Sequence, residues 1–356
     1  MLWCFPHRFD MVRAKSALRG IVMASSLPGA APVPEKGWIG LGFTDGGAGM
    51  ASQVRGLLRA AGASESLLQA PLKAPWKWLW PGMIPNRDWI FESPQLVQPD
   101  VCPDLVVTSG RQSIMASLAL KRRFGDRVFT VHTQDPRISP KHFDLVACPE
   151  HDGLGGPNVV GTFGAIHHVT PQLLAEVAAA GPLGGLERLT RPFLLVLLGG
   201  PTRNYAFSPP EMIDFQDRLA SAAESSGQQL AILPSKRTPR PWIDSFLSRF
   251  GNDHFVWAGQ GANPYLAALA LSSQIIVTCD SVNMISEAAA TGKPVYAEMM
   301  SPRRESRRFL RFHESFEQAG ISKPFWGTIE HWSYTTPNTT QQIANAIRER
   351  MLARRS

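Results

Sequence analysis

Short apolar segments that end in glycine or small polar residues recur along the chain, and this repetition constrains the possible folds most strongly. Clear examples are DLVVTSGR at 104–111, FLLVLLGGPTRNY at 193–205 and IIVTCDS at 275–281. Each has the pattern of a buried strand that leads through a polar loop into a helix. The alternation of strands and helices indicates a parallel sheet with ligand-binding loops at the carboxyl edge of its strands.

The same theme runs through both halves of the chain, and a glycine-rich, proline-bounded stretch at 181–192 lies between them. We therefore predict an α/β fold made of two Rossmann-like domains with a cleft between them. The N-terminal domain is expected at 36–185 and the C-terminal domain at 186–338.

The two ends of the chain carry separate expectations. The apolar stripe formed by Ile343, Ile347 and Met351 predicts a C-terminal helix within 339–356, which can cross back onto the first domain. Residues 1–35 are basic, and we expect a disordered or over-called start there, with a weak transit-like segment as the alternative.

The chain has 356 residues, of which 44% are hydrophobic and 18% charged, as in a globular protein with a substantial core. Its net charge of +7 favours anionic partners: nucleotides, phosphates, nucleic acid or an acidic membrane surface. The four cysteines are scattered without a CxxC pair, so neither a zinc site nor a disulfide framework is expected. No apolar run approaches the ~20 residues of a spanning helix, so we expect no integral membrane segment.

Two common nucleotide-binding motifs are incomplete. The glycine-rich turn after the first strand lacks the third glycine of GxGxxG, because Ser52 stands at that position. A Walker A loop fails as well, because Pro294 follows Gly292 and Lys293. These absences argue against a standard dinucleotide enzyme and against a P-loop NTPase.

The stretch TCDSVNMISEAAATGKP at 278–294 has the pattern of a ligand site. Thr278, Asp280 and Ser281 follow an apolar strand, and Ser281 can cap the helix that begins after it. The free backbone N–H groups of such a helix start favour an anion. Glu287 lies farther along the helix, where it can accept two ribose hydroxyls. The alternative is an ordinary strand, turn and helix with a capping serine.

Acidic side chains follow strands of the first half and suggest an acid–base site. Asp45 lies in TDGGAG at the end of the first strand, where it can act as a general base or bind a substrate hydroxyl. The alternative is a turn aspartate that caps the next helix. Asp135 and His151 lie in the loops QDP and EHD, which end two further strands. Two acidic loops with one histidine near a sheet edge make acid–base chemistry conceivable. A metal site is not expected, because no other histidine or cysteine has ligand spacing.

Two further stretches have unusual composition. Residues 64–99 are rich in proline and tryptophan, and we expect an extended loop with short helical turns that packs as a satellite cluster or forms part of a cleft wall or lid. Residues 303–318 predict a basic helix with five arginines. A solvated face is its simplest interpretation, and a phosphate clamp or contact with an anionic lipid surface are the alternatives.

A series of motifs over 38–350 resembles the elongated-mitochondria (mitochondrial fission) protein family, which has many bacterial members. The motifs are TDGGAG…Q, SGR, QDPR, FDLVACPEHDG, GPNVVGTFGAIHHVTP, LLGGPTRNY, TCDSVNMISEA and RFHESFEQAG. The family's usual first motif reads DGRAGHENQ. Here Gly47 replaces the arginine, and Met50, Ala51 and Ser52 replace HEN.

The resemblance implies a fold similar to that of GT-B glycosyltransferases, with a nucleotide-sugar donor bound mainly by the second domain. On that analogy Gly199 and Gly200 approach the donor diphosphate. The helix start at Ser281 binds phosphate, and Glu287 binds the ribose. The other residues predicted to contact the nucleotide sugar are Thr202, Asn204, Ser235, Arg237, Thr278, Asp280, Asn283 and Ser286.

The expected function is that of a glycosyltransferase in cell-envelope polysaccharide or lipid assembly. It uses a nucleotide-activated sugar as co-substrate, without a further cofactor, and Asp45, Asp135 or His151 activates a hydroxyl of a lipid or saccharide acceptor. Nucleic acid is not an expected partner. The expected location is the cytoplasm, with peripheral contact to an anionic membrane surface at its inner face. The alternatives are a nucleoside-diphosphate-sugar epimerase and a non-enzymatic adaptor that recruits a membrane-fission machinery.

Overall fold

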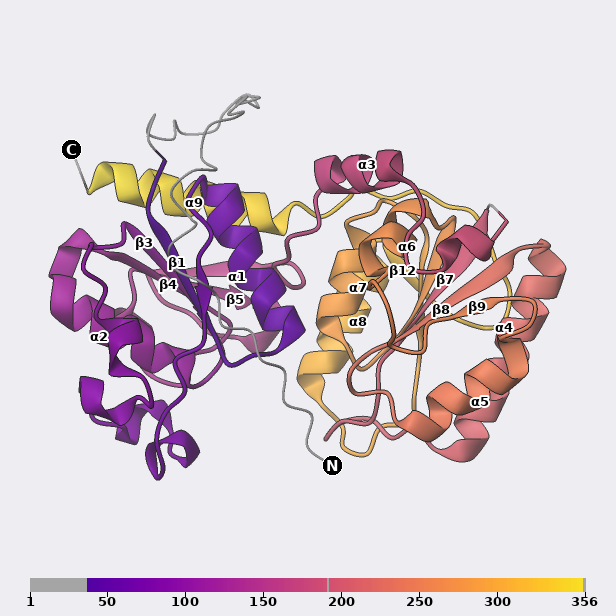
Figure 1. Ribbon diagram of the computed structural model, residues 1–356, viewed down its shortest axis with the longest axis horizontal. Coiled ribbons are helices and arrows are strands. Elements are labelled where there is room, and N and C mark those ends of the chain that lie inside the picture. Colours follow the sequence, from indigo (N-terminus) through magenta and orange to yellow (C-terminus); the bar gives the residue numbers. More distant parts are fainter. Residues whose placement is uncertain (1–36, 191, 355–356) are drawn as a thin grey trace. The chain divides into compact units, whose positions relative to one another are not determined.

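The computed structural model describes residues 37–190 and 192–354. Within these residues the strands form two six-stranded sheets, and every strand pairing in both is parallel. The strand orders are β2-β1-β3-β4-β5-β6 and β12-β11-β10-β7-β8-β9 (Figure 1). The predicted α/β fold with two Rossmann-like units is therefore confirmed. The expectation for residues 1–35 lies outside the described residues.

The first sheet has α1 and α9 on one face and α2 on the other, and we call this sheet with these helices the first lobe. Neighbouring residues of a strand point to opposite faces, so Leu105 and Val107 pack toward α1 while Val106 packs toward α2. The bounds are β1 Gly40–Thr44, α1 Ala48–Ala61, β2 Leu67–Leu68, β3 Leu105–Ser109, α2 Ser113–Phe124, β4 Phe129–Thr133, β5 Leu145–Pro149, β6 Val159–Thr162 and α9 Thr339–Ala353.

The second sheet has α3, α6, α7 and α8 on one face and α4 and α5 on the other, and these elements form the second lobe. Its first strand is apolar throughout because both of its faces are covered. The bounds are α3 Pro171–Ala180, β7 Phe193–Leu198, α4 Pro209–Ser226, β8 Gln229–Pro234, α5 Arg240–Phe250, β9 Phe255–Val256, α6 Tyr265–Leu271, β10 Gln274–Thr278, α7 Val282–Ala289, β11 Val295–Glu298, α8 Arg307–Gln318 and β12 Ser322–Pro324.

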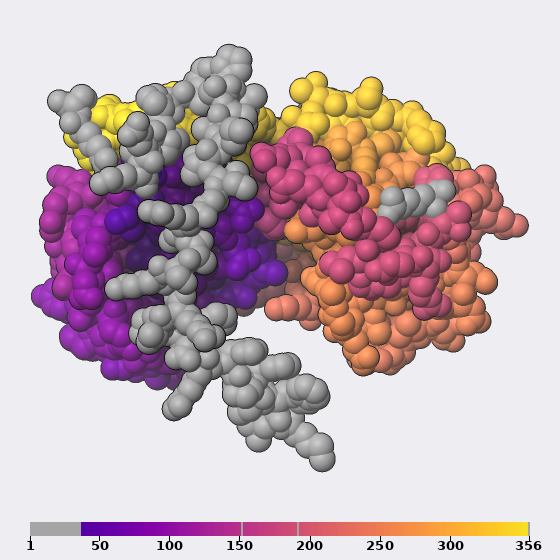
Figure 2. Space-filling model, turned by 45° about the horizontal axis from the view of Figure 1, so that its top comes forward, coloured from indigo at the N-terminus to yellow at the C-terminus, as the bar shows by residue number. Residues whose placement is uncertain are grey.

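Helix α9 comes from the end of the chain, yet it packs on the first lobe. Its side chains Ile343, Ile347 and Met351 are buried in the cluster that also contains Leu57 and Leu58 of α1. In the space-filling view, yellow residues of the C-terminal segment lie over violet residues of the first lobe and over orange residues of the second (Figure 2). The first lobe is thus assembled from two segments that are distant in the sequence.

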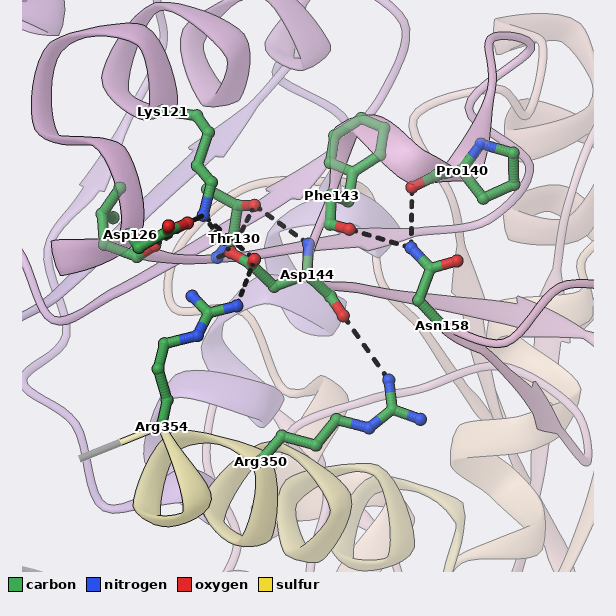
Figure 3. A network of polar contacts seen from close by, with 10 residues as sticks. Lys121, Asp126, Thr130, Pro140, Phe143, Asp144, Asn158, Arg350 and Arg354 are labelled. Carbon is green, nitrogen blue, oxygen red and sulfur yellow. Dashed lines mark hydrogen bonds and ion pairs between the residues drawn. The ribbon is translucent and has the colours of Figure 1, made fainter. Parts of the chain in front are cut away.

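Polar contacts hold the end of α9 against the edge of the first sheet. The Asp144 carboxylate accepts hydrogen bonds from Arg354 at 2.6 Å and from Lys121 at 3.0 Å (Figure 3). Its backbone carbonyl accepts a bond from Arg350 at 3.5 Å. This carboxylate therefore joins α2, β5 and α9.

Residues 64–99 contain β2 and the expected short helical turns. These turns are η1 (Trp76–Trp78), η2 (Pro81–Met83), η3 (Asp88–Ile90) and η4 (Pro94–Val97). Leu72, Ile84, Ile90 and Val97 are buried beneath them against α2. The segment therefore has an apolar base that packs on the first lobe.

No helix within residues 37–190 and 192–354 combines the length and the apolar character needed to cross a bilayer.

Candidate functional site

An arrangement of groups that bind an anion lies where β7 and β10 end in the second lobe. The N–H of Gly200 donates to the Asp280 carboxylate at 3.2 Å, and the hydroxyl of Thr278 donates to it at 2.7 Å. The Arg237 guanidinium forms an ion pair with the same carboxylate. The N–H of Gly199 donates to Thr278 at 2.7 Å. We call Gly199, Gly200, Arg237, Thr278 and Asp280 the anion cradle.

The charges of the cradle differ in their access to solvent. The side chain of Asp280 is 0% exposed, whereas that of Arg237 is 47% exposed. The two glycines are required by close packing: a Cβ on Gly199 would lie 1.9 Å from the Asp280 carboxylate, and one on Gly200 would lie 2.2 Å from the Arg237 carbonyl oxygen. The cradle therefore holds an anion that the chain itself provides, with a half-exposed cation at its opening.

Three other predicted residues shape the loops around the cradle. The hydroxyl of Ser235 accepts a bond from the N–H of Arg237 at 3.2 Å. Thr202 accepts a bond from the N–H of Asn204 at 3.1 Å, and the carbonyl of Asn204 accepts one from the N–H of Arg303 at 2.7 Å. These contacts place the backbone before α8 beside the glycine loop after β7.

Helix α7 begins at this edge of the sheet, and its predicted residues make different contacts. Ser281 caps the helix by accepting a bond from the N–H of Met284 at 3.3 Å. Asn283 accepts a bond from Gln53 at 3.0 Å, and Ser286 accepts one from the N–H of Ala165 at 2.9 Å. Asn283 and Ser286 therefore contact the first lobe instead of the cradle.

Glu287 also lies on the side of α7 that faces the first lobe. Its carboxylate accepts one hydrogen bond from the Ser52 hydroxyl at 2.6 Å and another from the Tyr265 hydroxyl at 2.5 Å. The residue is only 6% exposed. Burial raises the pKa of this carboxyl, although the two hydroxyl donors oppose the effect. Glu287 is thus a buried acceptor that already binds two hydroxyl groups.

The first lobe contributes Gln53 to the same contact. Its side-chain oxygen accepts hydrogen bonds from Ser109 at 2.8 Å, Thr133 at 3.0 Å and Gln134 at 3.3 Å, while its amide donates to Asn283. One buried side chain therefore connects the ends of β3 and β4 with α7.

Asp45 lies at the end of β1 but is engaged by α2. Its two carboxylate oxygens accept bonds from the N–H groups of Gln112 at 3.0 Å and Ser113 at 2.9 Å. Asp45 therefore caps α2, and the expectation that it caps the next helix in the sequence, α1, is wrong, because the ends of β1 and β3 bring it beside the start of α2.

Asp135 and the loop that contains His151 end β4 and β5. The Asp135 carboxylate accepts a bond from the N–H of Arg137 at 2.8 Å. The backbone of His151 lies in η7 (Glu150–Asp152), and its side chain lies outside the described part of the structure. Asp152 forms an ion pair with Arg308 of α8 at 2.5 Å. Burial raises the pKa of the Asp152 carboxyl; Arg308 opposes this shift and the nearby Asp135 charge adds to it.

The residues predicted to form the site did not include five that make these contacts: Ser52, Gln53, Asp152, Tyr265 and Arg308. Gln53 belongs to the motif TDGGAG…Q, and Asp152 follows His151 in the EHD loop, so both had a sequence signal. Ser52 and Tyr265 had none, because their role depends on Glu287, which is distant in sequence. In the part of the chain that the structure describes, no three His, Cys, Asp or Glu residues form a group that could hold a metal ion.

The comparisons with known proteins agree on family and fold. A family model described as Mitochondrial fission ELM1 matches residues 48–351. The chain is 29% identical over 280 residues to the Mitochondrial fission protein ELM1 of Arabidopsis thaliana, and the match covers 71% of this chain but only 65% of that relative, less than two thirds of its length. It is 24% identical over 282 residues to an uncharacterized protein of Rickettsia prowazekii, covering 69% of this chain and 79% of the relative.

Among solved structures, the UDP-GlcNAc 2-epimerase of Methanocaldococcus jannaschii, crystallised with UDP-GlcNAc and UDP, superposes with a TM-score of 0.50. The sequences are 11% identical, and the superposition covers 87% of this chain and 99% of the epimerase. At this identity the likeness shows a shared fold, the GT-B arrangement of two parallel-sheet units. With its family model matched over 48–351, the chain belongs to the mitochondrial fission ELM1 family and has a GT-B-like fold.

Proposed function

We propose that this protein is a glycosyltransferase that binds a nucleotide-activated sugar in the second lobe and transfers the sugar to a lipid or saccharide acceptor of the cell envelope. The observation that carries the proposal is the anion cradle. The N–H of Gly200, a guanidinium and the start of α7 converge at the carboxyl edge of a parallel sheet. This is where open α/β folds bind phosphorylated ligands.

Binding of a diphosphate requires a rearrangement of the cradle. The Arg237 guanidinium is half exposed, so it can turn from Asp280 to bridge that carboxylate and an incoming phosphate. A diphosphate offers several charged oxygens to the same donors, whereas Asp280 offers two. The energy of these contacts in a site with little water would stabilise the leaving diphosphate without a metal ion.

Glu287 is proposed to bind the ribose. It now accepts two hydroxyl groups, one from Ser52 and one from Tyr265. A ribose diol offers the same pair of donors to one carboxylate. Because Ser52 belongs to the first lobe, the exchange requires α1 to move away from α7. Donor binding would then be coupled to movement between the lobes, as in enzymes that close around their substrates.

The acid–base group is proposed to come from the first lobe. Asp45 is the weaker candidate because both of its carboxylate oxygens already accept hydrogen bonds from backbone N–H groups. Asp135 lies close enough to Asp152 for its charge to raise the pKa of that buried carboxyl. Such a pair, with one group more basic than usual, suits proton transfer from an acceptor hydroxyl. His151 stays a candidate in the adjoining loop.

The test is a thermal-shift series with UDP, GDP, CMP and their sugars. Uridine nucleotides come first, since the archaeal epimerase of similar fold was crystallised with UDP-GlcNAc and UDP. The right ligand should raise the melting temperature, because a ligand that binds only the folded state stabilises it. Arg237→Ala should abolish the shift. Arg240→Ala is the matched control, because Arg240 is exposed and pairs with Asp244 on α5.

Product analysis distinguishes the two enzymatic readings. A transferase consumes the sugar nucleotide only in the presence of an acceptor, whereas an epimerase releases an altered sugar nucleotide without one. Conversion without an acceptor would overturn the transferase proposal in favour of epimerisation.

A specific observation favours a non-enzymatic adaptor as the second candidate. Asn283, Ser286 and Glu287 are all engaged by the first lobe. The family relative from Arabidopsis is named as a mitochondrial fission protein. An adaptor would show no thermal shift with any nucleotide, and Arg237→Ala would leave its activity in cells intact.

A further inference from the structure

Three tryptophan rings and one methionine side chain are exposed between β2 and β3. Trp78, Trp80, Met83 and Trp89 are each more than half exposed. We call residues 73–89 the tryptophan segment. Outside it, Trp326 of the second lobe is the one other tryptophan of the described residues with a strongly exposed side chain. Apolar groups concentrated in this way on a protein surface mark an interaction site.

The fold holds these rings in an exposed position. The segment consists of the short turns η1, η2 and η3, which lie below α2 in Figure 1. Its other apolar side chains, among them Ile84 and Ile90, are buried beneath it. The Arg111 guanidinium donates to the backbone carbonyls of Leu79 at 2.8 Å and Lys77 at 2.5 Å. These contacts fix the backbone of the turns, so the exposed rings cannot easily turn inward.

The charges of the segment are basic. Residues 71–87 contain Lys73, Lys77 and Arg87 and no aspartate or glutamate. The next acidic residue, Asp88, is neutralised by an ion pair with Arg122 of α2. The Lys77 ammonium lies 5.3 Å from the centroid of the Trp78 ring. Apolar rings and positively charged side chains therefore alternate along this segment.

We propose that the tryptophan segment docks on a bilayer surface that carries anionic headgroups. Tryptophan prefers the boundary between headgroups and acyl chains, because its ring is apolar and its N–H can stay hydrated. Lysine and arginine near such a surface are attracted by the lipid charge. Exposed tryptophan rings next to lysine side chains supply both the apolar and the charged part of a contact with such a surface. This inference does not depend on the proposed transferase activity.

The test is co-sedimentation of the full chain with vesicles of phosphatidylcholine alone and of phosphatidylcholine mixed with phosphatidylglycerol. The wild type should bind the anionic vesicles, and more weakly at high salt. The double variant Trp78→Ser, Trp80→Ser should lose binding by about tenfold or more, since two interfacial anchors are removed. The double variant Lys73→Gln, Lys77→Gln should also lose about tenfold, because each basic residue near the surface contributes to attraction.

Trp326→Ser is the matched control, since it removes an equally exposed tryptophan elsewhere, and it should bind as the wild type does. The proposal is overturned if the wild type binds neither vesicle, or if Trp326→Ser weakens binding as much as the paired variants. The proposal also fails if the wild type does not bind vesicles but forms a dimer in light scattering that the tryptophan double variant abolishes. The segment would then be an interface between two copies of the chain. Melting temperatures check that each variant folds. If the tryptophan double variant does not fold, the lysine double variant still tests the proposal.

Discussion

The two lobes share one architecture but have different chemistry at the carboxyl edges of their sheets. In the first lobe, Gln53 accepts hydrogen bonds from three side chains, and the Asp45 carboxylate accepts two from backbone N–H groups at the start of α2. In the second lobe, the N–H of Gly200, the hydroxyl of Thr278 and the half-exposed Arg237 guanidinium contact the buried Asp280 carboxylate. The Asp45 carboxylate at the first edge is bound by backbone N–H groups, whereas the Asp280 carboxylate at the second edge is paired with a cation that has access to solvent.

The difference teaches that the parallel sheet determines where a site lies and that a few residues after each strand determine what it can bind. In both lobes the strand ends point to one edge and the helix starts face it. Gly199 after β7 and Gly110 after β3 each let a carboxylate approach the backbone. The next residue differs: it is Gly200 in the second lobe and Arg111 in the first, where the guanidinium holds the tryptophan segment. Four predictions can break or sharpen this contrast.

The largest effect is expected from Ile347→Ala, because the first lobe is completed by a helix from the end of the chain. Ile347 is fully buried between α9 and α1. Its truncation should lower the free energy of unfolding by about 2–5 kcal/mol, the usual cost of a cavity of this size. Urea unfolding measures it. Ile213→Ala is the control: this residue is 55% exposed on α4, and its loss should cost less than about 0.5 kcal/mol. Equal losses would show that α9 adds no stability to the first lobe.

The next effect concerns glycines at the two edges. Gly200→Ala should cost about 1–3 kcal/mol and weaken the cradle, because the new Cβ would meet the backbone carbonyl of Arg237, which cannot move alone. Gly49→Ala on α1 should cost much less, since its Cβ would meet the end of the Asn283 side chain and alanine favours a helix by about 0.5–1 kcal/mol. Chemical denaturation of both variants tests the ranking, and a reversed order contradicts it.

A smaller effect is expected from the helix caps. Asp45→Ala should destabilise by about 0.5–2 kcal/mol, because two N–H groups of α2 lose their acceptor. Ser281→Ala in the second lobe should fall at the lower end of that range, since it removes a single bond of 3.3 Å. Thermal unfolding of both variants, with Asp45→Asn as the conservative control, provides the comparison. A greater loss of stability for Ser281→Ala than for Asp45→Ala would contradict this ranking of the two caps.

The smallest effect is a change in pH dependence. Burial raises the pKa of Glu287 above its ordinary value of 4.5, so the folded state holds this proton more tightly than the unfolded state. The resulting stability is complete below pH 4.5 and is lost as the pH rises through the raised pKa. Above pH 4.5, the free energy of unfolding of Glu287→Gln should therefore fall less steeply with rising pH than that of the wild type. Urea titrations at a series of pH values measure the slope.

The first lobe supplies a counterpart of opposite sign. Burial lowers the pKa of His132 from 6.5 to about 3, so its contribution to stability is present above pH 6.5 and lost as the pH falls through this range. His132→Gln should flatten the acid side of the profile and leave the side above pH 6.5 unchanged. If Glu287→Gln changed the acid side in the same way, the assigned direction for Glu287 would be wrong.

The elements were largely predictable because each strand and helix has its own local pattern. FLLVLL is apolar along its whole length, as a strand covered on both faces must be, and Ser281 caps α7 where the motif suggested. The candidate site was predictable only as a set of loops. The resemblance named Glu287 and Asn283, but their actual partners Ser52 and Gln53 lie more than 200 positions away in the sequence, beyond any local pattern.

The sequence by itself determined the parallel-sheet architecture, the family and the identity of the residues after each strand, because hydrophobic periodicity and short motifs are local properties. Only the tertiary structure decided which of those residues meet. It placed Asp280 among the N–H groups and guanidinium of the cradle, Glu287 against two hydroxyls, and α9 on the first lobe. Burial and distance set the strength of a charge or a hydrogen bond, and both arise only when distant segments pack together.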